Sequence, residues 1–173
     1  MLIGGTRMLR GRVARYCLCA VALALAGFVG PQSGAQFTDP AAVAASSAMS
    51  IPQDDLIQPE ALNKLLTGRE RLIVLQVGSH VMFSQAHIRG AQYAGPGGQP
   101  AGLQLLERKT AGLPKTALIV IYCGCCPWNR CPNIAPAFHR LHELGFSNVK
   151  VLYIANNFGA DWAQKGYSIE TGG

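Results

Sequence analysis

The sequence lacks most of the features that mark nucleic-acid-binding, repeat and membrane-spanning proteins. After the first 35 residues no apolar run is long enough to cross a bilayer, and no segment repeats another. No basic cluster is interleaved with aromatic side chains, and no predicted helix has a basic face. We therefore expect no nucleic-acid partner and no stable membrane span from this part of the chain.

The positive charge of the chain is also not evenly spread. The whole sequence has 15 basic and 9 acidic residues, a formal charge of +6. The first 35 residues hold four arginines and no acid, so residues 36–173 keep 11 basic and 9 acidic residues, a formal charge of +2. The charge therefore belongs mainly to the N-terminal segment and gives no argument for an acidic partner.

Residues 1–35 have the pattern of a signal peptide. Basic residues come first: Arg7, Arg10, Arg12 and Arg15. An apolar stretch from Tyr16 to Val29 follows, and Ser33-Gly34-Ala35 supplies small residues for cleavage before Gln36. This stretch is too short to span a bilayer comfortably, so an uncleaved anchor is the weaker alternative. We expect an exported protein, periplasmic or secreted.

Cysteine is confined to two short stretches. Cys17 and Cys19 lie upstream of the predicted cleavage site and would leave with the leader. The other four lie within one stretch of nine residues: Cys123, Cys125, Cys126 and Cys131. Disulfides that stabilise a domain generally close long loops, whereas these cysteines could close only very short ones. We interpret them as reactive groups rather than structural bridges.

The rest of the chain is predicted to be a tether followed by one α/β domain. Residues 36–56, rich in Ala, Ser, Gln and Pro, are expected to be a flexible tether, residues 57–170 the domain and residues 171–173 a tail. Strands are predicted at 72–77, 117–122 and 149–154, with a weaker one at 91–94, and helices at 58–66, 103–109, 134–144 and around Trp162. Continuous apolar strands that alternate with helices predict a central parallel sheet flanked by helices on both faces.

Cys123 comes directly after the apolar strand 117–122 and before the helix 134–144. In open parallel sheets, ligands bind beyond the carboxyl ends of the strands. The turn that leads into a helix also faces unpaired N–H groups that favour an anion, and a thiolate is an anion. Since the ordinary cysteine pKa is about 8.5 and such sites can lower it by one to several units, Cys123 is predicted to be nucleophilic at neutral pH.

A series of short motifs over residues 57–170 resembles the rhodanese-like domain family. In order, they are the strand 72–77, His87-Ile88-Arg89-Gly90-Ala91, the strand that ends in Cys123, Leu141-His142-Glu143-Leu144-Gly145-Phe146-Ser147-Asn148-Val149, and Trp162 with Gly166-Tyr167. The resemblance implies a single α/β domain with a central parallel sheet. It also implies a sulfurtransferase that carries sulfane sulfur as a persulfide on Cys123, and a structural role for His87.

The sequence departs from the family pattern at three places. Gln76 and Gly78 stand where the family usually has an Asp and an Arg, and Asn156-Asn157 where it has two glycines. The loop from Cys123 to Asn133, a plausible helix N-cap, is longer than the usual active-site loop. Two prolines in this loop remove backbone donors, so the fold is carried over more safely than the sulfur donor.

Several side chains of the loop are candidates for the site. Cys123 is the predicted catalytic nucleophile, and Arg130, Gly124 and Trp128 are the predicted substrate-binding residues. The guanidinium of Arg130 would hold an anionic donor, and Trp128 would line the mouth of the pocket. The possible resolving thiols, which would convert a modified Cys123 into a disulfide, are Cys125, Cys126 and Cys131.

The predicted function is sulfur transfer from a small anionic donor, such as thiosulfate or a polysulfide, to a thiol acceptor, without a cofactor or a resident metal. One alternative is a thiol–disulfide redox protein that uses the C-x-x-C from Cys123 to Cys126. Another is a metal-binding module, in which the four thiolates would bind Zn(II) or Cu(I). A phosphatase needs Cys-x5-Arg, and no cysteine stands at that distance from Arg130.

Overall fold

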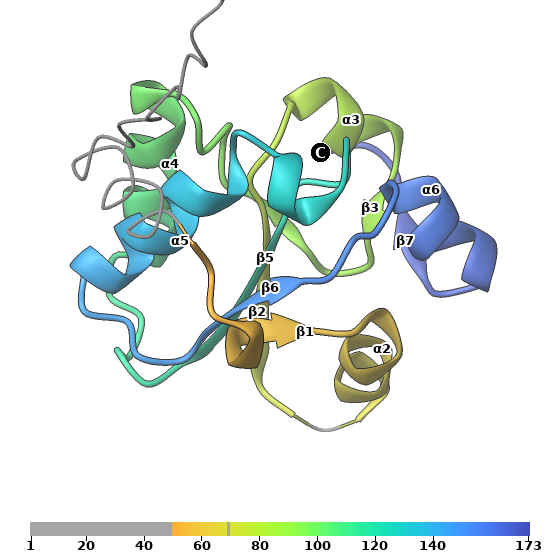
Figure 1. The fold of residues 1–173 in the computed structure, drawn as a ribbon, viewed down its shortest axis with the longest axis horizontal. Helices are drawn as coiled ribbons and strands as arrows, with labels where there is room; N and C mark the ends of the chain where they lie inside the picture. The colour runs from red at the N-terminus through yellow and green to blue at the C-terminus, as the bar shows by residue number, and fades with distance from the viewer. Residues whose placement is uncertain (1–49, 69) are drawn as a thin grey trace, which may run out of the picture. The chain divides into compact units, whose positions relative to one another are not determined.

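The structure is a computed structural model that describes residues 50–68 and 70–173. The predicted signal peptide and residues 36–49 of the predicted tether lie outside the described residues. In chain order, the elements (Figure 1) are η1 (Gln53–Asp55), β1 (Leu56–Ile57), α2 (Pro59–Thr67), β2 (Leu72–Gln76), α3 (His80–Gln85), β3 (His87–Ile88), β4 (Gln92–Tyr93), α4 (Pro100–Thr110), β5 (Leu118–Tyr122), η2 (Trp128–Arg130), α5 (Ile134–Glu143), β6 (Val149–Leu152), α6 (Phe158–Asp161), η3 (Ala163–Lys165) and β7 (Ile169–Glu170).

The main sheet has five strands in the order β1-β6-β5-β2-β4. All its neighbours pair in parallel, as the continuous apolar strands predicted. A short antiparallel pair, β3 with β7, forms a second sheet. Strand β5 lies in the middle of the main sheet, between β6 and β2, so the residue that follows it emerges at the centre of the carboxyl edge.

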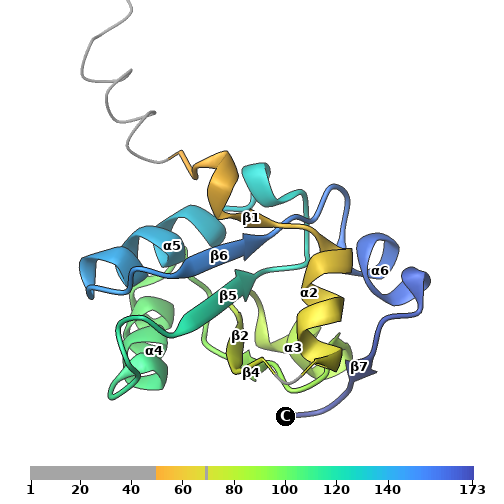
Figure 2. The ribbon, with the colours of Figure 1, turned by 90° about the horizontal axis from the view of Figure 1, so that it is seen from below.

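Helices cover both faces of the sheet, which confirms the predicted architecture (Figure 2). On one face, Ile119 and Ile121 of β5 pack with side chains of α4 and α5. On the other face, Val120 and Tyr122 pack with side chains of α2, α3 and α6. The alternation follows from the strand period of two residues, and it buries β5 completely from Ile119 to Tyr122.

Helix α5, which follows the cysteine loop, begins and packs as its sequence dictates. Its buried residues Ile134, Ala137, Phe138 and Leu141 recur at the spacing of one helix face. Pro136 lies in the first turn, where a backbone N–H has no partner within the helix, so it costs no helical hydrogen bond. This apolar face fixes the helix against the sheet and, with it, the C-terminal end of the loop.

The ordered domain begins earlier than predicted. Ile51 is only 8% exposed and belongs to the hydrophobic core, and β1 is the edge strand of the main sheet. These residues precede the predicted boundary at residue 57, because a single apolar residue and a strand of two residues leave no periodic pattern. At the other end, the predicted tail contacts the domain, since Gly172 N donates to Ser84 O at 2.8 Å.

The structure adds elements that the sequence pattern did not reveal. Helix α3 and strands β3 and β7 were not predicted, and the last predicted helix is two short turns, α6 and η3, with buried Trp162 between them. Within residues 50–68 and 70–173, no helix combines the length and hydrophobicity that a bilayer span needs. Both α3 and α6 contribute to the pocket described next.

Candidate active site

Cys123 lies at the carboxyl end of β5, on the floor of a cavity of about 320 Å³. Its side chain is 3% exposed. The walls come from the end of β2, from α3, from the first residues of the cysteine loop and from the start of α6. The predicted position of Cys123, at the carboxyl edge of a parallel sheet, is confirmed.

Two residues at the end of β2 make room for this thiol. A Cβ atom on Gly78 would lie 2.7 Å from Cys123 Sγ, so no other residue fits there without moving the sulfur. The buried amide of Gln76 accepts a hydrogen bond from Gly78 N at 3.1 Å and donates one to Cys123 O at 3.2 Å. Gln76 and Gly78, which depart from the family pattern, therefore hold and accommodate Cys123 without bringing a charge to it.

The chain turns back sharply after Cys123. Gly124 has φ +86°, a conformation that favours glycine, and a Cβ there would lie 3.0 Å from the Phe158 side chain. Its carbonyl accepts a hydrogen bond from Phe158 N at 2.9 Å. The turn brings Cys125 back beside Cys123, and Gly124 lines the cavity as expected.

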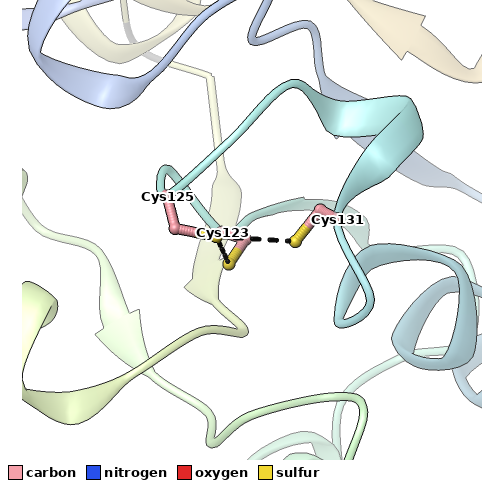
Figure 3. A group of neighbouring side chains, drawn as sticks. All are labelled: Cys123, Cys125 and Cys131. Atoms are coloured by element: carbon pink, nitrogen blue, oxygen red, sulfur yellow. Dashed lines mark hydrogen bonds between the residues drawn. The ribbon is translucent and has the colours of Figure 1, made fainter. Parts of the chain in front are cut away.

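Three sulfurs gather at this point, from both ends of the loop (Figure 3). The Sγ–Sγ distance is 3.3 Å between Cys123 and Cys125 and 4.0 Å between Cys125 and Cys131. All three sulfurs lie within 4.8 Å of one another, with Cys123 and Cys131 buried and Cys125 exposed. The sulfur of Cys126 lies 3.0 Å from that of Cys125 but outside the group of three, and all four are free thiols.

Asn133 completes the surroundings of the nucleophile. It occupies the predicted N-cap position of α5, but its side chain caps nothing. Instead, Asn133 Nδ2 donates to Cys123 Sγ at 3.4 Å, and its Oδ1 accepts from Gly98 N at 3.0 Å. Asn133 is therefore the N-cap residue by position, as predicted, but its side chain is a hydrogen-bond donor to the thiol rather than a cap.

These contacts make Cys123 the anion of the cluster. A hydrogen bond with the Cys131 thiol, joined by those from Asn133 and Cys125, lowers the pKa of Cys123 to about 6 against the opposing effect of burial. The same bond raises the pKa of Cys131, and desolvation with hydrogen bonds to Cys126 and Cys123 raises the pKa of Cys125 to about 12. At neutral pH the group of three therefore carries one negative charge, on Cys123, while Cys125 and Cys131 stay protonated.

The source of this anion stabilisation differs from the one predicted. The sequence suggested the backbone N–H groups and the dipole at the start of α5. In the structure, the lowering comes mainly from side-chain donors, with a smaller contribution from the backbone N–H of Cys125. Donors two, eight and ten residues after Cys123, namely Cys125, Cys131 and Asn133, leave no recognisable sequence signal, which is why these side-chain contacts could not be foreseen.

Arg130 and Trp128 lie elsewhere. They belong to η2, and they line a separate hollow of about 370 Å³ with residues 153–156. Trp128 N donates to Ile154 O at 2.9 Å, and the Trp128 ring faces Tyr153 at 6.4 Å. Arg130 is exposed and takes part in no ion pair within the described ranges 50–68 and 70–173. The structure does not bring either residue to the Cys123 cavity.

A buried carboxylate shapes the far wall of the cavity. Asp161 Oδ2 accepts hydrogen bonds from the backbone N–H groups of Asn156 at 2.6 Å and Asn157 at 3.1 Å. Asn157 in turn caps α6, since its Oδ1 accepts from Ala160 N at 3.0 Å. An asparagine three residues before that amide is a signal that could have revealed the short helix.

His87 has the structural position that the family resemblance implied. It is buried, its Nδ1 lies 2.8 Å from Phe83 O, and its ring stacks on Phe83 at 3.8 Å. Its Nε2 approaches Glu170 at 3.8 Å, which links β3 to β7. It does not line the cavity above Cys123.

The fold and the site together define a class: an open α/β domain with a thiol at the carboxyl edge of its parallel sheet. No protein-family model matches the sequence, and no curated protein matches it significantly. Solved structures do match the fold. The rhodanese-like domain of the Alr3790 protein from Anabaena sp. is 20% identical with a TM-score of 0.51, over 68% of this chain and 79% of that one.

Two further solved structures are similar. Thiosulfate sulfurtransferase from Pseudomonas aeruginosa is 24% identical with a TM-score of 0.52, over 68% of this chain and 20% of that one. The polysulfide-sulfur transferase homodimer from Wolinella succinogenes is 18% identical with a TM-score of 0.52, over 76% of this chain and 85% of that one. The chain therefore has a rhodanese-like fold, as the sequence resemblance implied.

Proposed function

We propose that the protein is a sulfurtransferase that carries sulfane sulfur as a persulfide on Cys123. The observation that carries this proposal is the setting of the Cys123 thiol, which lies on the floor of a cavity and is surrounded by hydrogen-bond donors that favour the thiolate. Two proteins of similar fold are a thiosulfate sulfurtransferase and a polysulfide-sulfur transferase, which supports the same chemistry.

The reaction consists of two displacements at sulfur. The Cys123 thiolate attacks a sulfane sulfur of the donor, the donor's S–S bond breaks, and the remaining sulfur fragment leaves with the electron pair. An acceptor thiolate then attacks the outer sulfur of the persulfide, and Cys123 leaves as a thiolate. No external oxidant is needed, and the donors from Cys131 and Asn133 stabilise the anion each time it is regenerated.

The lining of the cavity favours a polysulfide donor over thiosulfate. Its polar groups are neutral, including Gln76, Gln85 and Asn157, and no lysine, arginine or histidine is among the described residues that line it. Thiosulfate carries its charge largely on strongly hydrated sulfonate oxygens, which would enter without a cationic partner, and that is costly in a partly buried site. A polysulfide is also an anion, but its charge is on polarisable sulfur, and it presents only sulfur to the Cys123 thiolate.

Intact-mass measurement tests the proposal. The reduced protein is incubated with polysulfide, the excess is removed, and the mass is compared for the wild type, Cys123→Ser and Cys126→Ser. We expect an added sulfur on the wild type and on Cys126→Ser, and none on Cys123→Ser, which keeps its fold because Ser and Cys are close in volume. Undiminished loading of Cys123→Ser would move the nucleophile to another thiol.

The position of Cys125 favours a second, related activity. Its sulfur is 3.3 Å from that of Cys123. Once Cys123 carries the sulfur, the Cys123 charge that helps to raise the Cys125 pKa is gone, so Cys125 can lose its proton, attack the inner sulfur of the persulfide, release hydrosulfide and form a Cys123–Cys125 disulfide. The neighbour of Cys123 placed for this attack is therefore Cys125, in a C-x-C, rather than Cys126 of the C-x-x-C. Peptide mapping without reduction, at increasing times after loading without an acceptor, should find this bridge replacing the added sulfur; a persulfide that persists with no bridge would exclude the resolving role.

We also propose that the protein acts outside the cytoplasm, because residues 1–35 have the pattern of a signal peptide. N-terminal sequencing of the exported form should begin at Gln36. A membrane-bound product that keeps Arg7 would instead be an anchored protein.

A further inference from the structure

The three sulfurs of Cys123, Cys125 and Cys131 have the spacing of metal ligands. A metal–thiolate bond is about 2.3 Å long, so three sulfurs at the corners of a triangle around one ion lie roughly 4 Å apart. The observed separations are 3.3 Å and 4.0 Å, and all three sulfurs lie within 4.8 Å of one another. Only small side-chain adjustments would bring them to one ion.

The number of ligands selects the ion. Thiolates favour soft ions such as Cu(I) and Zn(II), but structural zinc sites are closed by four ligands. The fourth sulfur of the loop, Cys126, is adjacent in sequence to Cys125 and lies outside the converging group. Cu(I) accepts three thiolates in a plane. We propose that Cys123, Cys125 and Cys131 bind one Cu(I) ion.

The surroundings suit an ion that arrives from solvent. Cys125 is exposed and offers the first ligand, while Cys123 and Cys131 are buried; the three side chains gather at one point (Figure 3). The loop is held near its start, where Gly124 O accepts from Phe158 N, and in its middle, where Trp128 N donates to Ile154 O, and Asn133 Nδ2 donates to Cys123 Sγ. The ligands are therefore largely in place before binding, with a hydrogen bond that orients one of them.

Bound copper and carried sulfur would compete for the same atom. Cu(I) takes the lone pair with which Cys123 attacks a sulfur donor, so the loaded site cannot form a persulfide. This consequence rests on the proposed sulfurtransferase function, whereas copper binding itself does not. The enlarged loop, which places Cys131 beside Cys123, then makes sulfur loading sensitive to Cu(I).

A Cu(I) titration tests the site. The reduced full-length protein, kept anaerobic, competes with a chromogenic Cu(I) chelator. We expect one ion per chain, and at least about tenfold weaker binding for Cys125→Ser and Cys131→Ser. Cys126→Ser is the matched control, since it removes a thiol of the same loop that lies outside the triangle, and its affinity should equal that of the wild type.

Three results would overturn the assignment. Equal losses for Cys126→Ser and Cys125→Ser would show that the triangle is not the site. Unchanged binding in every variant would mean adventitious copper only, and tighter binding of Zn(II) than of Cu(I) in the parallel competition would reject a three-coordinate soft ion. Cys125 is exposed, so its variant is not expected to unfold and gives the decisive reading.

Sulfur loading on copper-saturated protein separates the site from its consequence. The protein is freed of excess copper, exposed to limiting polysulfide, stripped of copper and weighed, beside a metal-free sample. We expect sulfur on the metal-free sample only. If the metal-free sample takes no sulfur, the proposed function fails and the titration still stands. If both samples load equally, the competition is wrong and the proposed function still stands.

Discussion

The two halves of the cysteine loop differ in what surrounds them. The first half, with Cys123 and Cys125, folds onto the edge of the sheet, where short contacts from Gln76 and Asn133 hold it. The second half turns through η2 and places Trp128 and Arg130 on a separate hollow. The loop's only cation therefore lies apart from its thiolate, and the anion is stabilised by neutral donors. The proposed sulfur chemistry therefore belongs to the first half of the loop, the half with Cys123 and Cys125.

The largest effect on sulfur loading is expected from a substitution that crowds the Cys123 sulfur, in the first half of the loop. Replacing Gly78 by Ala places a Cβ 2.7 Å from Cys123 Sγ and 2.9 Å from Gln76 Nε2, closer than van der Waals contact allows. The thiol must rotate away from its donors, and misplacing a reacting atom by about 1 Å can cost roughly 100-fold in rate. Sulfur loading, followed by mass against time, should fall by at least about tenfold. An unchanged rate would show that the thiol does not need its present position.

The next effect comes from removing the strongest donor to the thiolate. The Cys123 pKa of about 6 means that loading should rise with pH through 6 and level off above it, and should be lost in acid. Cys131→Ala removes the first cause of that lowering, so the midpoint should move toward the ordinary value of about 8.5 and the rate at pH 7 should fall up to about tenfold.

A matched variant shows whether this change is electrostatic. Serine at position 131 keeps a hydroxyl donor, so Cys131→Ser should hold the midpoint closer to 6 than Cys131→Ala does. The groups that contact Cys123 from β2, from the loop and from the start of α5 are Gln76, Cys125, Cys131 and Asn133. None of them titrates near pH 6, because the amides are neutral and the pKa values of both thiols are raised. Identical profiles for the two variants would contradict the account.

A smaller loss is expected at Asn133. Asn133→Ala removes a hydrogen bond of 3.4 Å to Cys123 Sγ, a weaker cause of the lowered pKa than Cys131. The midpoint should rise by less than in Cys131→Ala, with loading at pH 6 reduced about threefold, in keeping with a net hydrogen bond of about 1 kcal/mol. A pH profile equal to that of the wild type would show that Asn133 does not stabilise the thiolate and only accepts the hydrogen bond from Gly98 N.

The smallest effect is expected at Arg130. The sequence predicted that the guanidinium fork of Arg130 would hold an anionic donor. Since Arg130 lines another hollow, we now expect Arg130→Gln to change loading from either donor less than about twofold. A loss specific to thiosulfate would show that Arg130 does act on the donor, and that both halves of the loop contribute to the site.

Much of the fold could be predicted because its main elements carry long apolar patterns. Strands β2, β5 and β6 and helices α2 and α5 are long enough for periodicity to show, and the position of Cys123 follows from the end of β5. Strands of two residues, such as β1, carry no such pattern. Their formation depends on tertiary pairing, which a single sequence does not display.

The candidate site could be predicted only in part, for a related reason. Strand-end position identified Cys123, but loop neighbours were ranked by sequence distance and residue type. The sequence pattern pointed to Arg130 and to the C-x-x-C with Cys126, whereas the left-handed turn at Gly124 brings Cys125 beside Cys123, and η2 places Arg130 on another hollow. Gln76 and Asn133 act through neutral side chains, which no charge or spacing pattern reveals.

The most direct test of the central claim is the location of the transferred sulfur. The reduced wild-type protein is loaded with polysulfide, the persulfide is trapped by alkylation, and the peptides are sequenced by mass spectrometry. The account predicts the added sulfur on Cys123 alone, with Cys125, Cys126 and Cys131 carrying only the alkyl group. Sulfur found first on Cys125 or Cys126, with Cys123 unmodified, would contradict it.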